Sequence, residues 1–255
     1  MESGYLILPG FLPEDLVDGL APEVDRWVDE GWRERSIAAC LSPGSQAPPP
    51  PLMELELPSH GRLLAHEPLM RILDELMAAP FVFHHLHSDR HGDVTGSKPW
   101  HHDHEPNDRD DPDLLMVHAL HYLGGLDGSV GHLVLLPGSH LEHADKRARA
   151  HLDTAALPGE IVVDRLPPGS TVLMNSALFH ARRPSDIPGS GKPRYFVDAS
   201  YCQVGALWRP VKPFWRHMLA RARARALDLD GGRRPELFAE RHFDEYTPAE
   251  RSPSV

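Results

Sequence analysis

The middle of the chain reads as a series of short β-strands, and this pattern constrains the fold most. From about residue 81 to residue 204, short apolar runs are separated by Gly, Pro and Asp. Clear strand candidates are Leu114–Leu123 and His132–Leu136, and Gly169–Asn175 reads as a turn followed by a strand. Short strands separated by turn residues are typical of antiparallel sandwiches and barrels. The sequence therefore predicts a mainly β core.

Helices are expected on both sides of this core. Within residues 13–79, apolar positions recur at helical spacing, as in Leu16, Leu20 and Val24. Residues 210–255 are predicted to form a helix followed by a loosely ordered tail. The chain of 255 residues is long enough for one sizeable core. We therefore expect one domain over residues 1–255, with a helical part at about 13–79, a β core at about 81–204 and a C-terminal part at 210–255.

Composition argues against several partners. The formal net charge is −11 and the pI is about 5.9, whereas nucleic acids and anionic membranes select basic surfaces. The N-terminus shows no basic region followed by an apolar run, and no stretch approaches the length of a membrane span. Two cysteines, Cys40 and Cys202, are too few for a disulfide framework. We expect a cytoplasmic protein that binds a small molecule and neither nucleic acid nor membrane; its oligomeric state stays open.

A metal motif is predicted at Lys98–Asp103, where His101 and Asp103 lie two positions apart. Residues i and i+2 of an extended segment point to the same side, so both can reach one ion. The same His-x-Asp spacing also occurs at His87/Asp89, His91/Asp93, His143/Asp145, His151/Asp153 and His242/Asp244. Only the His101 copy follows a Pro-Trp pair and precedes two readable strands. A later strand places His180 at its far end as a third ligand. Two imidazoles and one carboxylate form the face that holds non-haem Fe(II) and leaves positions open.

The order of these motifs resembles the phytanoyl-CoA dioxygenase (PhyH-like) family of Fe(II)- and 2-oxoglutarate-dependent oxygenases. The family's elements match Trp100-His101-His102-Asp103, the segment Gly131–His140 (Gly-His-Leu-Val-Leu-Leu-Pro-Gly-Ser-His), His180 and Arg194. The opening Gly4–Leu12 is also similar to the usual start of the family, so the resemblance extends from the N-terminus to about Cys202.

The resemblance implies a double-stranded β-helix, the jelly roll of the cupins, with His101, Asp103 and His180 as iron ligands and catalytic residues. Fe(II), 2-oxoglutarate and O₂ are the implied cofactor and cosubstrates. Arg194 is the implied partner of the distal carboxylate of 2-oxoglutarate, because its planar guanidinium matches a carboxylate and stays charged. Family members often carry a second polar anchor on the strand before the metal motif. This chain has histidines at 84, 85 and 87 there, and no second anchor is assigned.

The expected activity is hydroxylation of a small molecule, such as a metabolite or natural product, with release of succinate and CO₂. Halogenation is disfavoured because the halogenases of this superfamily lack the metal carboxylate, which Asp103 supplies here. The alternatives are a cupin-type metalloenzyme that does not use 2-oxoglutarate and a non-catalytic jelly-roll binding protein. The substrate and the site of its oxidation are left open, as is desaturation or another outcome in place of hydroxylation.

Three further features allow two interpretations each. His102 and His104 flank the ligands and belong either near the metal or substrate, or in solvent. The acidic segment 108–113 is either a solvated loop or a site for a cationic substrate group. His118 and His121 lie on one predicted strand with opposite parity, so at most one can face the interior.

Overall fold

The computed structural model describes residues 2–41, 49–92, 96–109, 111, 113–142, 144–185, 187, 192–225, 227 and 234–247. Its helices are α1 (Glu14–Asp29), α2 (Trp32–Leu41), α3 (Pro58–Leu64), α4 (Glu67–Met77) and α5 (Trp215–Ala224), with short 3₁₀ turns at Glu54–Glu56, Ser139–Leu141, Ala150–Leu152 and Glu240–His242. Its strands are β1 (Tyr5–Leu8), β2 (Phe81–His91), β3 (Lys98–His101), β4 (Met116–Tyr122), β5 (Leu126–Asp127), β6 (His132–Leu135), β7 (Ile161–Val163), β8 (Arg165–Leu166), β9 (Ser170–Asn175), β10 (His180–Arg183) and β11 (Arg194–Gln203). The end of the tail predicted to be loosely ordered, residues 248–255, lies outside the described residues.

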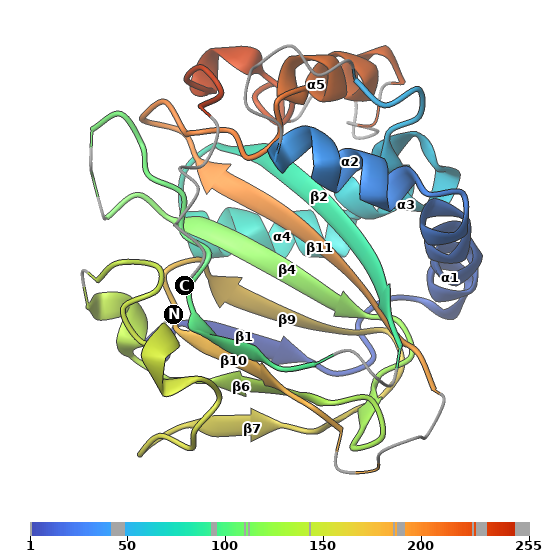
Figure 1. Ribbon diagram of the computed structural model, residues 1–255. Coiled ribbons are helices and arrows are strands. Elements are labelled where there is room, and N and C mark those ends of the chain that lie inside the picture. The colour runs from blue at the N-terminus through green and yellow to red at the C-terminus, as the bar shows by residue number, and fades with distance from the viewer. Residues whose placement is uncertain are drawn as a thin grey trace.

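Two antiparallel sheets form the body of the protein (Figure 1). The large sheet has the strand order β1-β9-β4-β11-β2, and the small sheet has the order β3-β10-β6-β7. A two-stranded ribbon of β5 and β8 completes the β structure among the described residues. Most neighbours in the two sheets are not consecutive in sequence, β6 and β7 excepted, as expected when strands cross over between two facing sheets. The jelly-roll fold predicted from the sequence is confirmed.

The N-terminal strand β1 belongs to the large sheet, although the sequence pattern placed the β core at about 81–204. β1 pairs with β9 in the register Tyr5 to Met174 through Leu8 to Thr171. The backbone N–H groups of Leu12 and Asn175 also bond to Gly169 and Gly4 respectively, which fixes the strand at this edge. The opening residues therefore extend the sheet on the side away from β2.

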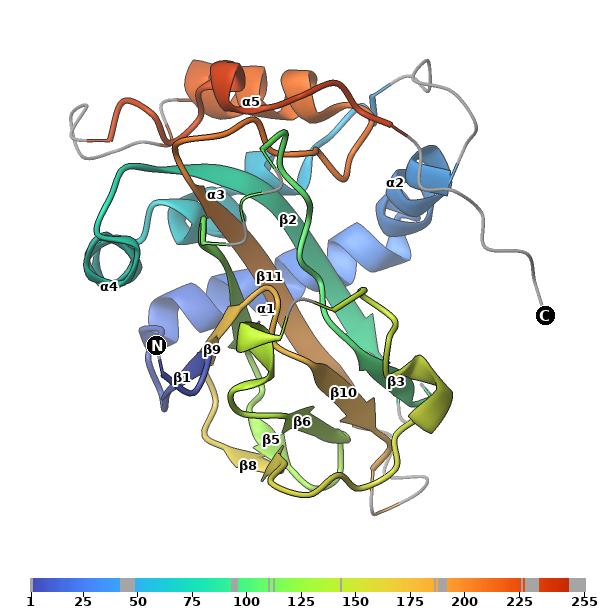
Figure 2. The ribbon, with the colours of Figure 1, turned by 90° about the vertical axis from the view of Figure 1, so that its left-hand side faces the viewer.

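Helices cover the outer face of the large sheet, because alternate residues of its strands are apolar and point toward them. On β11, Val197, Ala199 and Tyr201 are fully buried on this face. The α1 residues Leu16 and Leu20 are buried in the same apolar cluster. Figure 2 shows α1 crossing behind β11, so this helix lies along the sheet surface. No helix in the described part of the chain has the length and apolar composition needed to span a membrane.

The opposite faces of β2, β4 and β11 point between the sheets and are unusually polar. The cross-strand register lines up His85, Ser200 and His118 in one row, and His87, Asp198 and Leu120 in the next. Further rows hold Asp89 with Phe196 and Tyr122, and then His91 with Arg194. The interior between the sheets is therefore lined by ionisable side chains from strands that are distant in sequence.

Candidate metal centre

The pairing of β3 with β10 brings the three predicted ligands together. His101 is the last residue of β3 and His180 is the first residue of β10, and the antiparallel register places them opposite one another. Asp103 follows two residues after His101, and its backbone N–H donates to the carbonyl oxygen of Ser176. A pair of strands about 80 residues apart in sequence therefore builds the centre predicted from the sequence motif.

The three side chains converge on one point. The distance from His180 Nε2 to Asp103 Oδ2 is 3.2 Å, and from His101 Nε2 to Asp103 Oδ1 it is 3.6 Å. The centroids of the two imidazole rings are 4.2 Å apart. Ligand atoms of all three residues lie within 4.8 Å of one another, which suits one ion between them.

Hydrogen bonds on the far side of each ring orient the two imidazoles. His101 Nδ1 lies 2.7 Å from the carbonyl oxygen of Pro99, and His180 Nδ1 lies 3.0 Å from that of Leu178. A carbonyl oxygen can only accept, so each Nδ1 carries the proton and each Nε2 presents a lone pair. His101 Nε2 is buried and has no hydrogen-bond partner. A histidine that binds a metal through one ring nitrogen typically donates the N–H of the other ring nitrogen to a carbonyl or carboxylate, which fixes the orientation of the ring.

The charge states also suit a cation. Burial, reinforced by the neighbouring His180 and Lys98, lowers the pKa of His101 to about 3, which keeps the ring neutral. Burial by itself raises the pKa of Asp103, but Lys98 and the two histidines outweigh it and hold that pKa well below its ordinary value. Lys98 Nζ lies 3.9 Å from Asp103 Oδ1. The donor set is therefore one carboxylate and two imidazoles, which fits Fe(II).

Arg194 lies at the start of β11 and is buried, with 7% of its surface exposed. Its Nη2 donates to Tyr122 Oη at 3.2 Å, and its guanidinium carbon lies 5.0 Å from the centre of the Tyr122 ring. Nε and Nη1 of Arg194 are buried without a hydrogen-bond partner. A buried cation with two unused donors fits an anionic ligand, because leaving such donors unpaired costs free energy.

One cavity of about 260 Å³ connects these groups. It is lined by His101, Asp103 and His180 and also by Arg194 and Asp198. The cavity is large enough for a small ligand together with an ion, and its walls come from both sheets.

Tyr122 and Arg182 are cavity residues that were not found from the sequence, although strand parity could have indicated both. Tyr122 lies on the inward face of β4, next to Arg194. Arg182 follows His180 by two positions on β10 and so shares its face. Arg182 donates to the carbonyl oxygen of Gly96 at 2.9 Å and approaches the His91 ring at 3.0 Å. Arg182 is therefore a further cation of the cavity, which Arg33 and Lys98 also line, and the sequence left the second anchor unassigned.

Of the competing His-x-Asp pairs, His87/Asp89 is engaged in ion pairs through its carboxylate. Asp89 binds Arg33 at 2.6 Å and His91 at 2.8 Å, so the first pair is held in an ion-pair network. His143 lies outside the described residues. Among the described residues, only two groups of His, Cys, Asp or Glu have the spacing of a metal site: the predicted triad, and His85 with His118 and Asp198.

His118 and His121 take the opposite orientations that strand parity predicts. His118 points between the sheets, where its Nδ1 lies 3.2 Å from Asp198 Oδ2. His121 points to the other face and bonds to Thr171 Oγ1 at 2.7 Å. The alternation of side chains along a strand does not tell which of the two histidines lies between the sheets. The register of β4 with its neighbouring strands determines this.

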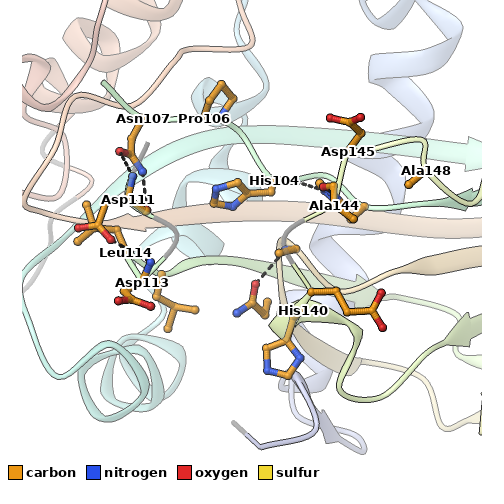
Figure 3. Close-up of a pocket in the computed structure, with 15 residues that line it drawn as sticks. His104, Pro106, Asn107, Asp111, Asp113, Leu114, His140, Ala144, Asp145 and Ala148 are labelled. Atoms are coloured by element: carbon orange, nitrogen blue, oxygen red, sulfur yellow. Dashed lines mark hydrogen bonds between the residues drawn. The ribbon is translucent and has the colours of Figure 1, made fainter. Parts of the chain in front are cut away.

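His102 and His104 line a separate cavity of about 680 Å³ that does not include the metal triad. Figure 3 shows His104 in this cavity. His102 Nε2 lies 2.9 Å from the carbonyl oxygen of Ala144, and His104 Nδ1 lies 2.8 Å from Ser176 Oγ. The described acidic residues Asp111 and Asp113 lie on the rim of this cavity, as Figure 3 shows. This larger cavity is not the one that the three predicted ligands face.

Comparison with known proteins gives a family and a fold. The sequence model of the phytanoyl-CoA dioxygenase (PhyH) family matches residues 1–186. No curated protein shows significant sequence similarity to the chain.

Among solved structures, the chain is similar to the non-haem α-ketoglutarate-dependent epimerase SnoN from nogalamycin biosynthesis, at 19% identity and a TM-score of 0.61 over 82% of this chain and 80% of that one. It is also similar to HygX from Streptomyces hygroscopicus with nickel and 2-oxoglutarate bound, at 20% identity and a TM-score of 0.57 over 79% and 83%. A third is EctD from S. alaskensis with 2-oxoglutarate and 5-hydroxyectoine, at 18% identity and a TM-score of 0.59 over 82% and 75%.

These structures show a shared fold, and the family match covers well over half of the chain. The chain therefore belongs to the phytanoyl-CoA dioxygenase (PhyH) family, a family of iron- and 2-oxoglutarate-dependent oxygenases.

Proposed function

We propose that this protein hydroxylates a small molecule, using 2-oxoglutarate and O₂ and releasing succinate and CO₂. His101, Asp103 and His180 hold Fe(II) in this proposal, and Arg194 binds the distal carboxylate of 2-oxoglutarate. One observation carries the proposal: the oriented Nε2 lone pairs and the unpaired donors of Arg194 face the same cavity.

The bound iron and 2-oxoglutarate supply the oxidising chemistry, and the chain supplies position. The backbone carbonyls of Pro99 and Leu178 fix the two imidazole rings before the ion binds. Tyr122 holds the guanidinium of Arg194 by a hydrogen bond and a cation–π contact, so little side-chain entropy is lost when a carboxylate binds. Leu120, Leu133 and Phe196 supply the apolar part of the cavity wall.

A small-molecule substrate is supported by the size of the cavity. Its volume of about 260 Å³ leaves limited room once 2-oxoglutarate is bound. Two of the similar structures contain small molecules: SnoN was solved with nogalamycin RO and HygX with hygromycin B. The cytoplasmic location expected from the sequence remains a prediction.

The test is an anaerobic titration of the metal-free protein with Fe(II) and 2-oxoglutarate, followed by visible absorption. A 2-oxo acid chelated to Fe(II) gives a weak charge-transfer band, which we expect for the wild type and not for His101→Ala or His180→Ala. His151→Ala is the matched control, because His151 is exposed and belongs to another His-x-Asp pair. Iron binding without the band in the wild type would refute the cosubstrate assignment.

A further inference from the structure

A second group of metal-ligating side chains lies on the large sheet, across the cavity from the triad. It consists of His85 from β2, His118 from β4 and Asp198 from β11, with Ser200 of β11 beside them. All four residues face the space between the sheets. We propose that His85, His118 and Asp198 form a second divalent-cation site that takes Zn²⁺, with the Ser200 hydroxyl at the fourth position.

The donor spacing is close to that of a tetrahedral ion. A zinc–donor distance of roughly 2.0–2.1 Å gives donor–donor distances of about 3.3–3.4 Å at the tetrahedral angle. With Asp198 Oδ1 as the carboxylate donor, His118 Nδ1 and Ser200 Oγ each lie 3.3 Å from it, and Ser200 Oγ lies 3.4 Å from His85 Nε2. The contact of His118 Nδ1 with Ser200 Oγ, at 2.7 Å, is a hydrogen bond that the ion would replace.

A chain of hydrogen bonds sets the tautomer of His85. His84 Nε2 lies 2.9 Å from the carbonyl oxygen of Arg209, so His84 donates from Nε2 and accepts at Nδ1. His85 Nδ1 lies 2.7 Å from His84 Nδ1 and must therefore donate. His85 is left with a lone pair on Nε2, the atom that faces Ser200. A ligating histidine whose other ring N–H is held by a partner is the usual arrangement at metal sites.

Burial and charge favour a cation here. His85, His118, Asp198 and Ser200 are all buried or nearly so. His118 is the one ion-pair partner of Asp198 among the described residues. A buried carboxylate that has no Lys or Arg partner in the described structure gains from a bound cation.

The site also has an access route, because Asp198 lines the cavity that contains the triad. The two sites nonetheless use different residues from different sheets. The triad offers three donors at the end of the small sheet, whereas the second group has a fourth donor in place. Four N and O donors around a buried point favour zinc in tetrahedral coordination.

The test counts zinc bound per chain. Metal-free protein is saturated with Zn²⁺, passed through a desalting column, and analysed by elemental emission. We expect two equivalents in the wild type, one in His118→Phe, one in His180→Ala, and none in the double variant. His121→Phe is the matched control, because His121 is an equally buried histidine on the same strand that points away from the site; it should retain two equivalents.

Cobalt provides an independent readout. Tetrahedral Co²⁺ absorbs visible light far more strongly than six-coordinate Co²⁺, so the intense band should appear in His180→Ala and be lost in His118→Phe. Melting in metal-free buffer reports whether each variant folds. If His118→Phe does not fold, Asp198→Asn, which keeps the shape of the side chain, should lose the same equivalent and the same band.

The possible failures are distinguishable. A wild type that binds one equivalent, lost in His180→Ala, would overturn the second site and leave the triad intact. A single equivalent that His180→Ala retains would instead contradict the triad. Two equivalents retained in His118→Phe would also overturn the proposal.

Discussion

The role of Arg194 makes the sharpest quantitative prediction about this enzyme. Its guanidinium is buried, its Nη2 is used by Tyr122, and its Nε and Nη1 are free to donate. A carboxylate of 2-oxoglutarate at this position would complete the pairing. Removing one partner of a buried, hydrogen-bonded charge pair costs about 2–5 kcal/mol, which corresponds to a change on the order of thirty-fold to several thousand-fold. Arg194→Ala should therefore raise the apparent KM for 2-oxoglutarate by a factor in this range.

The assay is succinate formation at varied 2-oxoglutarate without added substrate, since slow uncoupled turnover needs no knowledge of the substrate. Metal binding should be nearly unchanged in Arg194→Ala, because the arginine does not contact the ligands. Tyr122→Phe removes a neutral partner that positions the guanidinium in the free and the bound protein alike, so it should raise this KM much less than Arg194→Ala does.

Arg182→Ala is the matched comparison, because Arg182 is a second arginine of the same cavity whose donors are used by Gly96 and His91. We expect this variant to change the KM for 2-oxoglutarate much less than Arg194→Ala does. Wild-type saturation in Arg194→Ala, with a large effect in Arg182→Ala, would refute the reasoning and assign the anchor to β10.

Two further predictions concern the metal centre and the core. Lys98→Met should raise the pKa of Asp103, because Lys98 is the largest of the influences that lower it. The carboxylate binds metal only above its pKa, so on acidification the variant should release its metal at a higher pH than the wild type does. A pH titration of metal binding with an unchanged midpoint would contradict this. Leu20→Ala should lower the free energy of unfolding by about 2–5 kcal/mol, because Leu20 is completely buried between α1 and the large sheet. Urea denaturation measures the free energy of unfolding. The control is Leu141→Ala, at a residue that is 72% exposed, which should change this free energy by less than about 0.5 kcal/mol. Equal effects of the two substitutions would be inconsistent with the packing described.

The sequence by itself determined the fold class, the family and the order of the candidate ligands. Local patterns were sufficient for these conclusions. Apolar residues and turn residues mark each strand and so indicate the fold class. His101 and Asp103 lie two positions apart on one extended segment, which indicates a pair of ligands. His180 could be proposed because it follows a readable strand. The approach of His180 to His101 required the pairing of β3 with β10, which no local pattern specifies.

Only the tertiary structure decided which side chains share the interior of the large sheet. His85, His118 and Asp198 come from three strands, and each is unremarkable in a chain with 18 histidines. The β11–β2 register contains an irregularity between Ser200 and Tyr201, next to this group. A slip of one residue in a strand turns every side chain to the other face, so the meeting of these residues depends on cross-strand register. Register is set by the packing of the whole sheet against the helices, and that information is spread over the entire chain.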